Sequence, residues 1–485
     1  MSSELFSWPA VYPVLTVLLA ALVVMVADLF GRPGSRLIPW LAGIGLGLGV
    51  VVSLLSWNLQ AEAYSGAWLI GAYPVYFYVL FGIAALITVV LSTAHEERQG
   101  RFPGEYYSLL LFGTVGMMTM ASAGDLITLI IGLETMSVSA YVLVALNRGD
   151  RRSSEGAVKY FLLGAFASAF LLYGVALIYG TTRTTTFSEL ALYLTSVEGT
   201  PPLLLTAGVA MLLVGLGFKV AAVPFHMWAP DAYQAAPTPI TGFMATAVKA
   251  AGFAAVLRIF GFIVAGTGAA LTDAIWWLAV LSMVVGNFAA LAQANLKRML
   301  AYSSIAHAGY LLTAIVGSNP SASTNSGSGI LFYLVAYALM TLGAFGVLVI
   351  VGGGADRRET LVDMAGLAAK RPLLAAAMAV FMISLSGIPP TAGFFGKFYV
   401  FGAAIESGYV GLAVIGVLTS VVGVAYYLRV VVYMYMKPAE KAFLPWPRPR
   451  LAEVVVYLLV IAVLVIGIAP GGLLEPARNA FASLF

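Results

Sequence analysis

Long runs of apolar residues dominate this chain, and short polar segments separate them. Most of these runs are about 20 residues long, the length at which an α-helix crosses the ~30 Å hydrocarbon core of a bilayer. Strands of a membrane barrel would instead alternate apolar and polar positions over ~10 residues, which these runs do not do. The pattern predicts fourteen transmembrane helices, at residues 10–30, 38–57, 72–93, 106–122, 124–146, 157–180, 202–224, 238–262, 273–292, 300–317, 328–351, 372–405, 409–436 and 452–471.

The composition excludes the soluble classes of protein. Of the 485 residues, 61% are hydrophobic and 9% are charged, and the mean hydropathy is +0.97. Soluble domains carry about 25% charged residues, and disordered chains are polar and charged. No segment between the helices is long enough for a second domain of at least ~50 residues. We therefore expect an all-α polytopic membrane protein that forms a single membrane domain over residues 1–485.

Metal, haem and nucleic-acid sites are also disfavoured. The chain has no cysteine and three histidines, so thiolate metal sites and iron–sulfur clusters are excluded and a haem has few candidate ligands. The net charge of +4 lies in loops at the membrane edge, which gives no support to nucleic-acid binding. We expect no cofactor and no metal in this chain.

The loop charges predict the orientation of the helices. Loops that follow odd-numbered helices hold 17 of the 25 basic residues, among them Arg148, Arg151 and Arg152. The opposite side, termini included, holds only Arg183 and Arg478. Because basic loops stay in the cytoplasm, both termini are expected on the non-cytoplasmic side.

Several charged residues fall inside the apolar runs, where an ionisable group costs at least ~2.5–3.5 kcal/mol. Lys159, Arg258 and Arg429 lie toward helix ends, where a long side chain can reach the membrane surface. Four others lie deeper, namely Glu134, Lys219, Lys249 and Lys397. Internal ion pairing is the structural explanation for these four, but one acid cannot neutralise three lysines.

A series of buried lysines with one carboxylate can pass protons. A lysine out of water can lose its proton, while a nearby carboxylate favours its charged form. His226 and His307, and also Lys159, are candidates to extend such a relay, since imidazole titrates near neutral pH. For each of these histidines, a purely structural role as a hydrogen-bonded residue of the core is an alternative of equal weight to a role in the relay. Composition does not distinguish a proton path from a sodium path.

Two of the predicted helices are interrupted near a deep lysine. The segment 217–243, which begins in helix seven, contains Pro224, Pro230, Pro237 and Pro239 after Lys219. Helix twelve contains Gly387, Pro389 and Pro390 before Lys397. Proline breaks a helix, and irregular backbone at membrane depth is tolerated where it is buried or lines a hydrated cavity. The breaks lie five helices apart, which predicts two inverted five-helix repeats, helices 4–8 and 9–13. The chain then divides into residues 1–105, 106–262, 273–436 and 452–471.

The chain resembles the antiporter-like membrane subunits of respiratory complex I, the bacterial NADH-quinone oxidoreductase, and among them the subunit N type. The stretches that carry the resemblance are GLETMSVSAYVLVAL, KYFLLGAFASAFLLYG, GFKVAAVPFHMWAPDAYQAAPTPITGF, NLKRMLAYSSIAHAGY and SLSGIPPTAGFFGKF.

The resemblance implies roles for the deep charges. Glu134 and Lys219 would be a pair whose separation switches during pumping, Lys249 the central relay and Lys397 the lysine near the exit. The related subunit M has a glutamate in place of Lys397. Electrons would move in partner subunits that hold NADH, FMN, iron–sulfur clusters and quinone.

The expected function is therefore proton translocation coupled to quinone reduction, in the inner membrane of a bacterium. The expected partners are the other membrane and peripheral subunits and the membrane lipid, with no nucleic acid. A subunit of a multisubunit Na⁺/H⁺ antiporter is the alternative. A purely structural scaffold is disfavoured by the unpaired excess of buried lysines.

Overall fold

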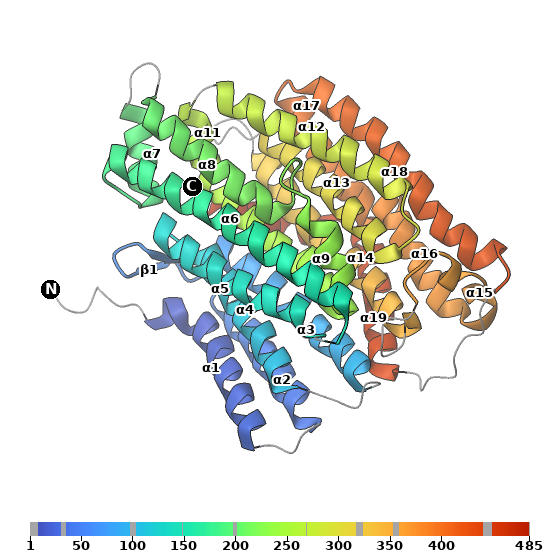
Figure 1. The fold of residues 1–485 in the computed structure, drawn as a ribbon. Coiled ribbons are helices and arrows are strands. Elements are labelled where there is room, and N and C mark those ends of the chain that lie inside the picture. Colours follow the sequence, from blue (N-terminus) through green and yellow to red (C-terminus); the bar gives the residue numbers. More distant parts are fainter. Residues whose placement is uncertain are drawn as a thin grey trace.

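A computed structural model describes residues 8–30, 35–97, 103–147, 149–196, 201–267, 269–316, 324–352, 358–439 and 449–484. Helices make up most of these residues (Figure 1), as the apolar runs predict. Arg148 and residue 317, the predicted end of one helix, lie outside the described residues.

The first half of the chain forms α1 (Trp8–Phe30), α2 (Leu37–Leu55), β1 (Ala61–Ala63), β2 (Trp68–Ile70), α3 (Ala72–Glu97), α4 (Gly104–Ser122), α5 (Leu126–Ala145), α6 (Arg151–Thr182), α7 (Phe187–Ser196), α8 (Leu203–Val220), α9 (Trp228–Ala235), α10 (Thr238–Phe243), the π-helical segment η1 (Met244–Val248) and α11 (Lys249–Thr267). The second half forms α12 (Ala269–Leu291), α13 (Leu296–Val316), α14 (Thr324–Gly352), the 3₁₀ turn η2 (Val362–Met364), α15 (Leu367–Lys370), α16 (Pro372–Ser386), α17 (Ala392–Glu406), α18 (Val410–Met436), α19 (Arg450–Ile468) and α20 (Gly471–Ala482).

Every predicted apolar run falls on one helix or on consecutive helical segments. Within the described residues, 12 helical stretches are long and apolar enough to cross a membrane. The other two predicted crossings fall on α4, which begins with polar residues, and on the pair α16 and α17, each of 15 residues. The number of fourteen crossings therefore stays a prediction.

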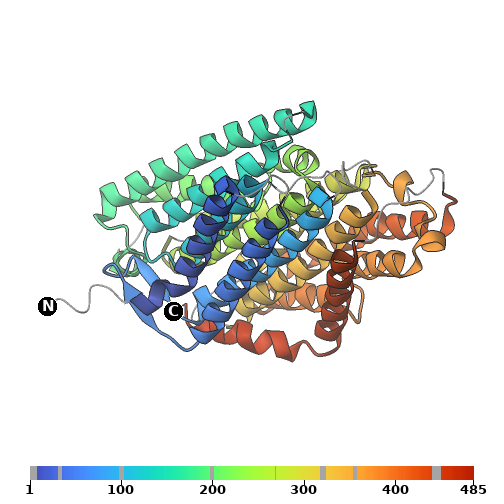
Figure 2. The ribbon, with the colours of Figure 1, turned by 90° about the horizontal axis from the view of Figure 1, so that it is seen from below.

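Three helical stretches form the centre of the bundle. The apolar windows of Thr238–Phe260, α13 and α14 are 100%, 94% and 89% buried, whereas those of α6 and α19 are 33% and 28% buried. Peripheral helices present apolar side chains outward, as a surface in contact with lipid requires. Figure 2 shows α1, α2 and α3 (blue) side by side on one face of this bundle. The central helices carry Lys249 and His307.

The predicted break in helix seven separates α8 from α9. Ala221 ends α8 in the left-handed region, with φ of +58°. The amide of Ala222 donates to the carbonyl of Gly217 at 2.8 Å, which satisfies one of the carbonyls left free at the helix end. Lys219 therefore lies in the last turn of α8, directly before the break.

The predicted break in helix twelve separates α16 from α17 in the same way. Gly387 ends α16 with φ of +82°, and the amide of Ile388 donates to the carbonyl of Ile383 at 3.2 Å. A Cβ atom at Gly387 would lie 2.8 Å from Cδ of Lys397, so this position requires glycine for its space as well as its backbone.

Two arginines in apolar runs bind helix ends. Arg258 of α11 donates to the carbonyl of Ala123, at the end of α4. Arg429 of α18 donates to the carbonyls of Leu291 and Gln293, at the end of α12, at 3.0 and 2.5 Å. The prediction that Arg258 extends to the membrane surface is wrong, because this side chain is 3% exposed and packs over the ring of Tyr73. The C-terminal end of a helix attracts a cation, which explains both placements.

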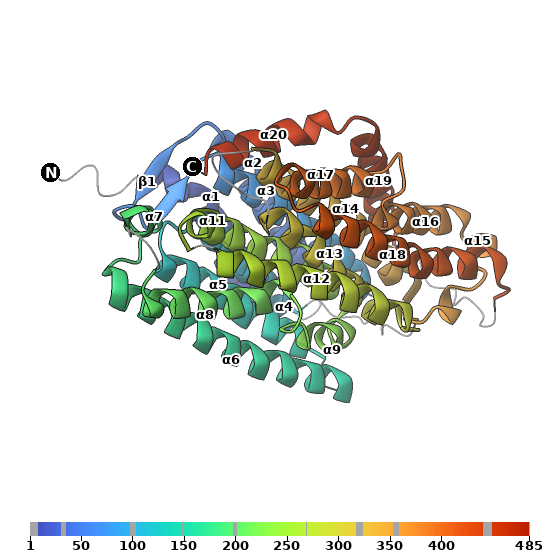
Figure 3. The same cartoon turned by 90° about the horizontal axis from the view of Figure 1, so that it is seen from above.

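Some elements have no counterpart in the predicted set. The hairpin of β1 and β2 joins α2 to α3, and α20 contacts α3 and α14 at the edge of the bundle (Figure 3). Helix α6 begins at Arg151 rather than at the predicted residue 157, since Asp150 accepts a hydrogen bond from the amide of Arg152 and caps the helix.

Candidate functional site

Lys219 binds a polar face of α5. Glu134, Ser137 and Tyr141 share this face, because residues three and seven positions apart point the same way on a helix. Nζ of Lys219 donates to Oγ of Ser137 at 2.7 Å and to the hydroxyl of Tyr141 at 3.3 Å. The lysine is 4% exposed, so these two neutral oxygens replace water around its charge.

The Glu134 carboxylate and the Lys219 ammonium bind different hydroxyl groups. Glu134 accepts a hydrogen bond from Oγ of Ser168 on α6 at 2.5 Å. Between these two described residues no contact of 4.0 Å or less forms an ion pair, although Glu134 still attracts Lys219 electrostatically. The arrangement is a loose charge pair in which each charge has its own hydroxyl partner.

Lys249 lies directly after the π-helical segment η1 and is 2% exposed. Its Nζ donates to the carbonyl oxygen of Ser304 on α13 at 2.5 Å and also contacts the Ser304 hydroxyl. Single π turns often occur at functional sites, because they reorient the residues that follow.

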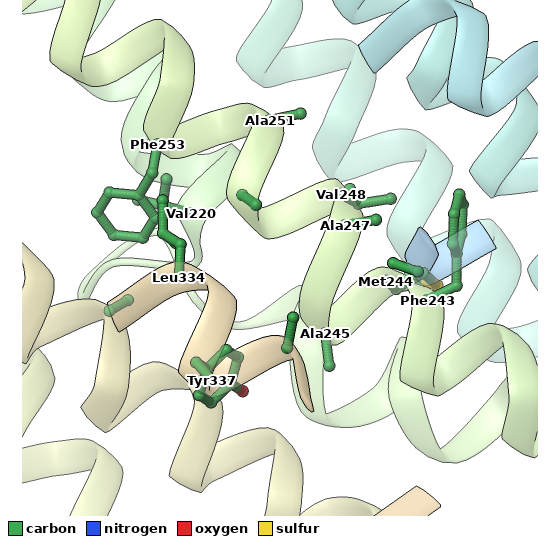
Figure 4. Close-up of a cluster of buried hydrophobic side chains, with 14 of the residues drawn as sticks. Val220, Phe243, Met244, Ala245, Ala247, Val248, Ala251, Phe253, Leu334 and Tyr337 are labelled. Atoms are coloured by element: carbon green, nitrogen blue, oxygen red, sulfur yellow. The ribbon is translucent and has the colours of Figure 1, made fainter. Parts of the chain in front are cut away.

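Four side chains of η1 belong to a cluster of buried hydrophobic residues, Met244, Ala245, Ala247 and Val248. Figure 4 shows this cluster together with Val220, Phe243, Leu334 and Tyr337. The backbone that holds Lys249 is therefore fixed in a dry cluster. The carbonyl and hydroxyl of Ser304 therefore provide the polar contacts of the Lys249 ammonium group.

His307 connects α13 to two neighbouring helices. Its Nδ1 lies 2.5 Å from the hydroxyl of Tyr333 on α14, and its Nε2 lies 3.0 Å from the hydroxyl of Tyr427 on α18. The Tyr427 hydroxyl also contacts Oγ of Ser303, the neighbour of Ser304 in sequence. Lys249 and His307 thus contact neighbouring serines of α13, Lys249 directly and His307 through Tyr427.

Lys397 lies at the break between α16 and α17. Its Nζ donates to the carbonyls of Leu385 and Ser386 at 3.0 and 2.9 Å, and to Oγ of Ser420 on α18 at 2.7 Å. The two carbonyls end α16 and have no partner within the helix. Lys397 therefore caps α16, with all three ammonium protons in hydrogen bonds.

Tyr310 occupies the space between His307 and Lys397. Its ring centroid lies 5.4 Å from that of His307, and Nζ of Lys397 lies 5.2 Å from the Tyr310 centroid. Both Lys249 and Lys397 act electrostatically on His307. The buried histidine therefore lies within the electrostatic range of two buried cations.

Lys159 is placed apart from the other lysines. It is 46% exposed and forms ion pairs with Glu155 at 2.7 Å and with Asp231 at 3.0 Å. Partial burial raises the pKa of Asp231, but hydrogen bonds from Arg298 and Lys159 outweigh this and hold the pKa below its usual value. Lys159 lines a pocket of about 260 Å³ beside this cluster.

His226 lies in the segment between α8 and α9, and its Nδ1 is buried without a hydrogen-bond partner among the described residues. None of its described hydrogen bonds joins it to the deep lysines. The structure thus brings Lys249, His307 and Lys397 around one polar region, keeps Glu134 with Lys219, and leaves Lys159 and His226 outside both groups.

The sequence did not identify the hydroxyl groups that bind the lysines. Ser137 and Tyr141 follow Glu134 at helical spacing, a signal present in the stretch GLETMSVSAYVLVAL. Ser304, Ser420 and Tyr427 come from helices distant in sequence, so no spacing reveals them. Among the described residues, no group of three or more histidine, aspartate or glutamate side chains could hold a metal ion.

Residues 123–423 match the family described as "NADH:quinone oxidoreductase/Mrp antiporter, TM". The matched region contains every deep lysine and Glu134. The chain is 48% identical over 443 residues to NADH-quinone oxidoreductase subunit N of Trichlorobacter lovleyi, covering 91% of this chain and 90% of that relative. It is 42% identical over 458 residues to subunit N of Heliobacterium modesticaldum, covering 94% of each.

Solved structures agree with these relatives. A chain of respiratory complex I from Thermus thermophilus superposes with a TM-score of 0.82 at 37% identity, covering 96% of this chain and 98% of that one. A chain of the Mrp complex from Dietzia sp. DQ12-45-1b gives a TM-score of 0.84 at 20% identity, covering 100% and 98%, which shows a shared fold alone. On the strength of the sequence identity and the matched family region, the chain belongs to the NADH-quinone oxidoreductase subunit N family.

Proposed function

We propose that this chain translocates protons across the membrane through Glu134, Lys219, Lys249, His307 and Lys397, as a subunit of a NADH-quinone oxidoreductase. The observation that carries the proposal is the chemistry around the three deep lysines. Each is buried and bonded to hydroxyl or carbonyl oxygens rather than to a carboxylate. A lysine with neutral partners can release its proton without leaving an uncompensated negative charge beside it.

The relatives favour this function over cation/proton antiport. The Mrp complex shares the fold, so the fold does not decide between the two. The identity of 48% to a subunit N supports the quinone-coupled complex. A sodium site would need several oxygen ligands, as hard cations do, and in the sequence Glu134 is the only carboxylate far inside an apolar run.

We further propose that the chain carries no redox group. Without cysteine and with three histidines, it has few ligands for one. NADH, FMN, iron–sulfur clusters and quinone would then be bound by partner subunits, and this chain would receive energy as an electrostatic or conformational change. The proposed location is the inner membrane of a bacterium.

Local structure supports two inverted repeats, α4 to α11 and α12 to α18. The left-handed ends at Ala221 and Gly387 are one matching feature. A second is a pair of backbone bridges, from Asp125 to Thr186 and from Asn295 to Thr360, each at the start of the second helix of its repeat. Together with the arginine caps on α4 and α12, these matches favour fourteen crossings in the four parts predicted from the sequence.

Lys249→Met is the direct test of the relay. The variant keeps the length of the side chain but removes its charge, so the complex should assemble while proton pumping falls about tenfold or more, as expected for the loss of a charged group that accepts the transferred proton. Pumping is measured as acidification of vesicles during quinone reduction. Lys437→Met, at an exposed lysine, is the control and should pump normally. Normal pumping by assembled Lys249→Met would contradict the proposal.

The proposed orientation predicts which cysteines react from each side. Because the chain has no cysteine, single substitutions are easy to read. Ser154→Cys, exposed near the start of α6, should react with an impermeant maleimide from the cytoplasmic side. Ser196→Cys, exposed at the end of α7, and Ser2→Cys should react only from the opposite side. Cytoplasmic labelling of Ser2→Cys would reverse the orientation.

A further inference from the structure

A groove of about 420 Å³ opens on the outer surface between α2 and α3, the helices on the blue face of Figure 2. Its wall is apolar over most of its length, and the helix α19 closes one edge with Leu451. The residues that line it are Arg36, Pro39, Trp40, Gly43, Ile44, Leu86, Val89, Val90, Thr93, Glu97 and Leu451.

The charged groups of the groove lie at one end of it. Arg36 directly precedes α2 and Glu97 is the last residue of α3, so the two antiparallel helices bring them together at the membrane boundary. Their side chains form an ion pair across the mouth and are 72% and 48% exposed. Trp40, which is 64% exposed, stands beside them, as tryptophan does at the level of lipid headgroups.

We propose that this groove binds a phospholipid whose headgroup carries a primary ammonium, such as phosphatidylethanolamine. The phosphate would accept hydrogen bonds from Arg36, the ammonium would donate to Glu97, and an acyl chain would lie along Ile44 and Val90. An unpaired arginine would select any anionic lipid. The adjacent cation and anion instead match a headgroup that carries both charges, since each charge meets its opposite.

The order of the lining groups favours a lipid over a helix of another subunit. The paired charges and the exposed Trp40 lie at the membrane boundary, and the apolar residues of α2 and α3 continue from them into the bilayer. A phospholipid has a charged headgroup and an apolar chain in the same order, so each part meets its matching surface.

Photo-crosslinking of the assembled complex in lipid nanodiscs tests the proposal. The probe is phosphatidylethanolamine with a diazirine in its acyl chain, and crosslinked peptides are mapped by mass spectrometry. We expect crosslinks in residues 36–44 and 86–97. Unlabelled phosphatidylethanolamine should compete about tenfold better than phosphatidylcholine, whose quaternary ammonium cannot donate a hydrogen bond to Glu97.

Two variants test separately the part of the groove that would hold the acyl chain and the part that would hold the headgroup. A Cβ at Gly43 would meet only Cδ1 of Leu86, at 3.7 Å, so Gly43→Phe can fold and will fill the groove. Crosslinking should then fall about tenfold, whereas Gly47→Phe, on the same helix with open space around it and outside the groove, should not change it. Glu97→Gln should remove the preference for phosphatidylethanolamine and favour the anionic phosphatidylglycerol.

Three results would overturn the proposal. The first is equal competition by phosphatidylcholine and phosphatidylethanolamine. The second is that Glu97→Gln still prefers phosphatidylethanolamine to phosphatidylglycerol. The third is crosslinking of a photoreactive residue at Gly43 to a protein subunit instead of lipid, which would make the groove a subunit interface.

Discussion

Glu134→Gln should leave the complex assembled but slow proton pumping and the coupled quinone reduction about tenfold. Glutamine keeps the shape of the side chain and can still accept the hydrogen bond from Ser168. It holds no negative charge, so the Lys219 ammonium keeps its hydroxyl partners on α5 but loses the electrostatic attraction of a carboxylate. The hydrogen bond from Ser168 also loses its charged acceptor. Hydrogen bonds to charged groups contribute about 1.5–3 kcal/mol, and each 1.4 kcal/mol is tenfold in rate. Both rates are measured in vesicles that contain equal amounts of assembled complex.

A matched pair of serines tests whether pumping depends on the hydrogen bond between Lys219 and α5. Ser137→Ala removes the oxygen that lies 2.7 Å from Nζ of Lys219. Ser139→Ala is the control, because Ser139 is also buried on α5 and also donates to a carbonyl four residues earlier, but is not a partner of Lys219. Ser137→Ala should reduce pumping and Ser139→Ala should not.

The Glu134 prediction has a clear contrary outcome. If assembled Glu134→Gln and Lys219→Ala both pump normally, the two charges only hold α5 and α8 together. A loss of assembly in Glu134→Gln that leaves the specific activity of the remaining complex normal would lead to the same conclusion. Assembly is therefore measured separately, by the yield of intact complex from the membrane.

The sequence predicted the helices well because a bilayer leaves few choices. Backbone groups in hydrocarbon must be bonded within their own segment, so an apolar run becomes a helix. The breaks after Lys219 and before Lys397 were predicted for a related reason, since proline and glycine interrupt that bonding. Side-chain capping is less visible in sequence. Asp150 extends α6 by six residues at its start, and no apolar pattern marks that extension.

The charges of the site were predicted, but their partners were not. Glu134, Lys219, Lys249 and Lys397 are conspicuous because ionisable residues are costly in a membrane. Hydroxyl groups are common in membrane helices, so Ser304 and Ser420 carry no such signal. Arg258 shows the opposite failure. Its position in an apolar run suggested exposure at the membrane surface, yet the free carbonyl at the end of α4 offers it a buried partner.

Lys397→Arg should assemble with near-normal stability and still pump protons poorly. Arginine can donate to the carbonyls of Leu385 and Ser386 and so keep the cap on α16. It hardly ever releases a proton, so it cannot act as a proton carrier. Lys397→Ala should impair both, because it also leaves those carbonyls and Ser420 without their donor. Pumping and thermal stability are measured on the same preparations.

Arg429 provides the matched control for this substitution. Like Lys397, it donates to carbonyls at the end of a helix in the second half of the chain, here α12, but it binds none of the relay residues. Arg429→Lys exchanges the same two residue types in the reverse direction and should leave pumping unchanged. If Lys397→Arg pumps poorly while Arg429→Lys pumps normally, the defect is assigned to proton release rather than to the altered helix cap. Near-normal pumping by Lys397→Arg, with a strong defect in Lys397→Ala, would instead make Lys397 a fixed positive charge, because a group that never loses its proton would then be sufficient at this position.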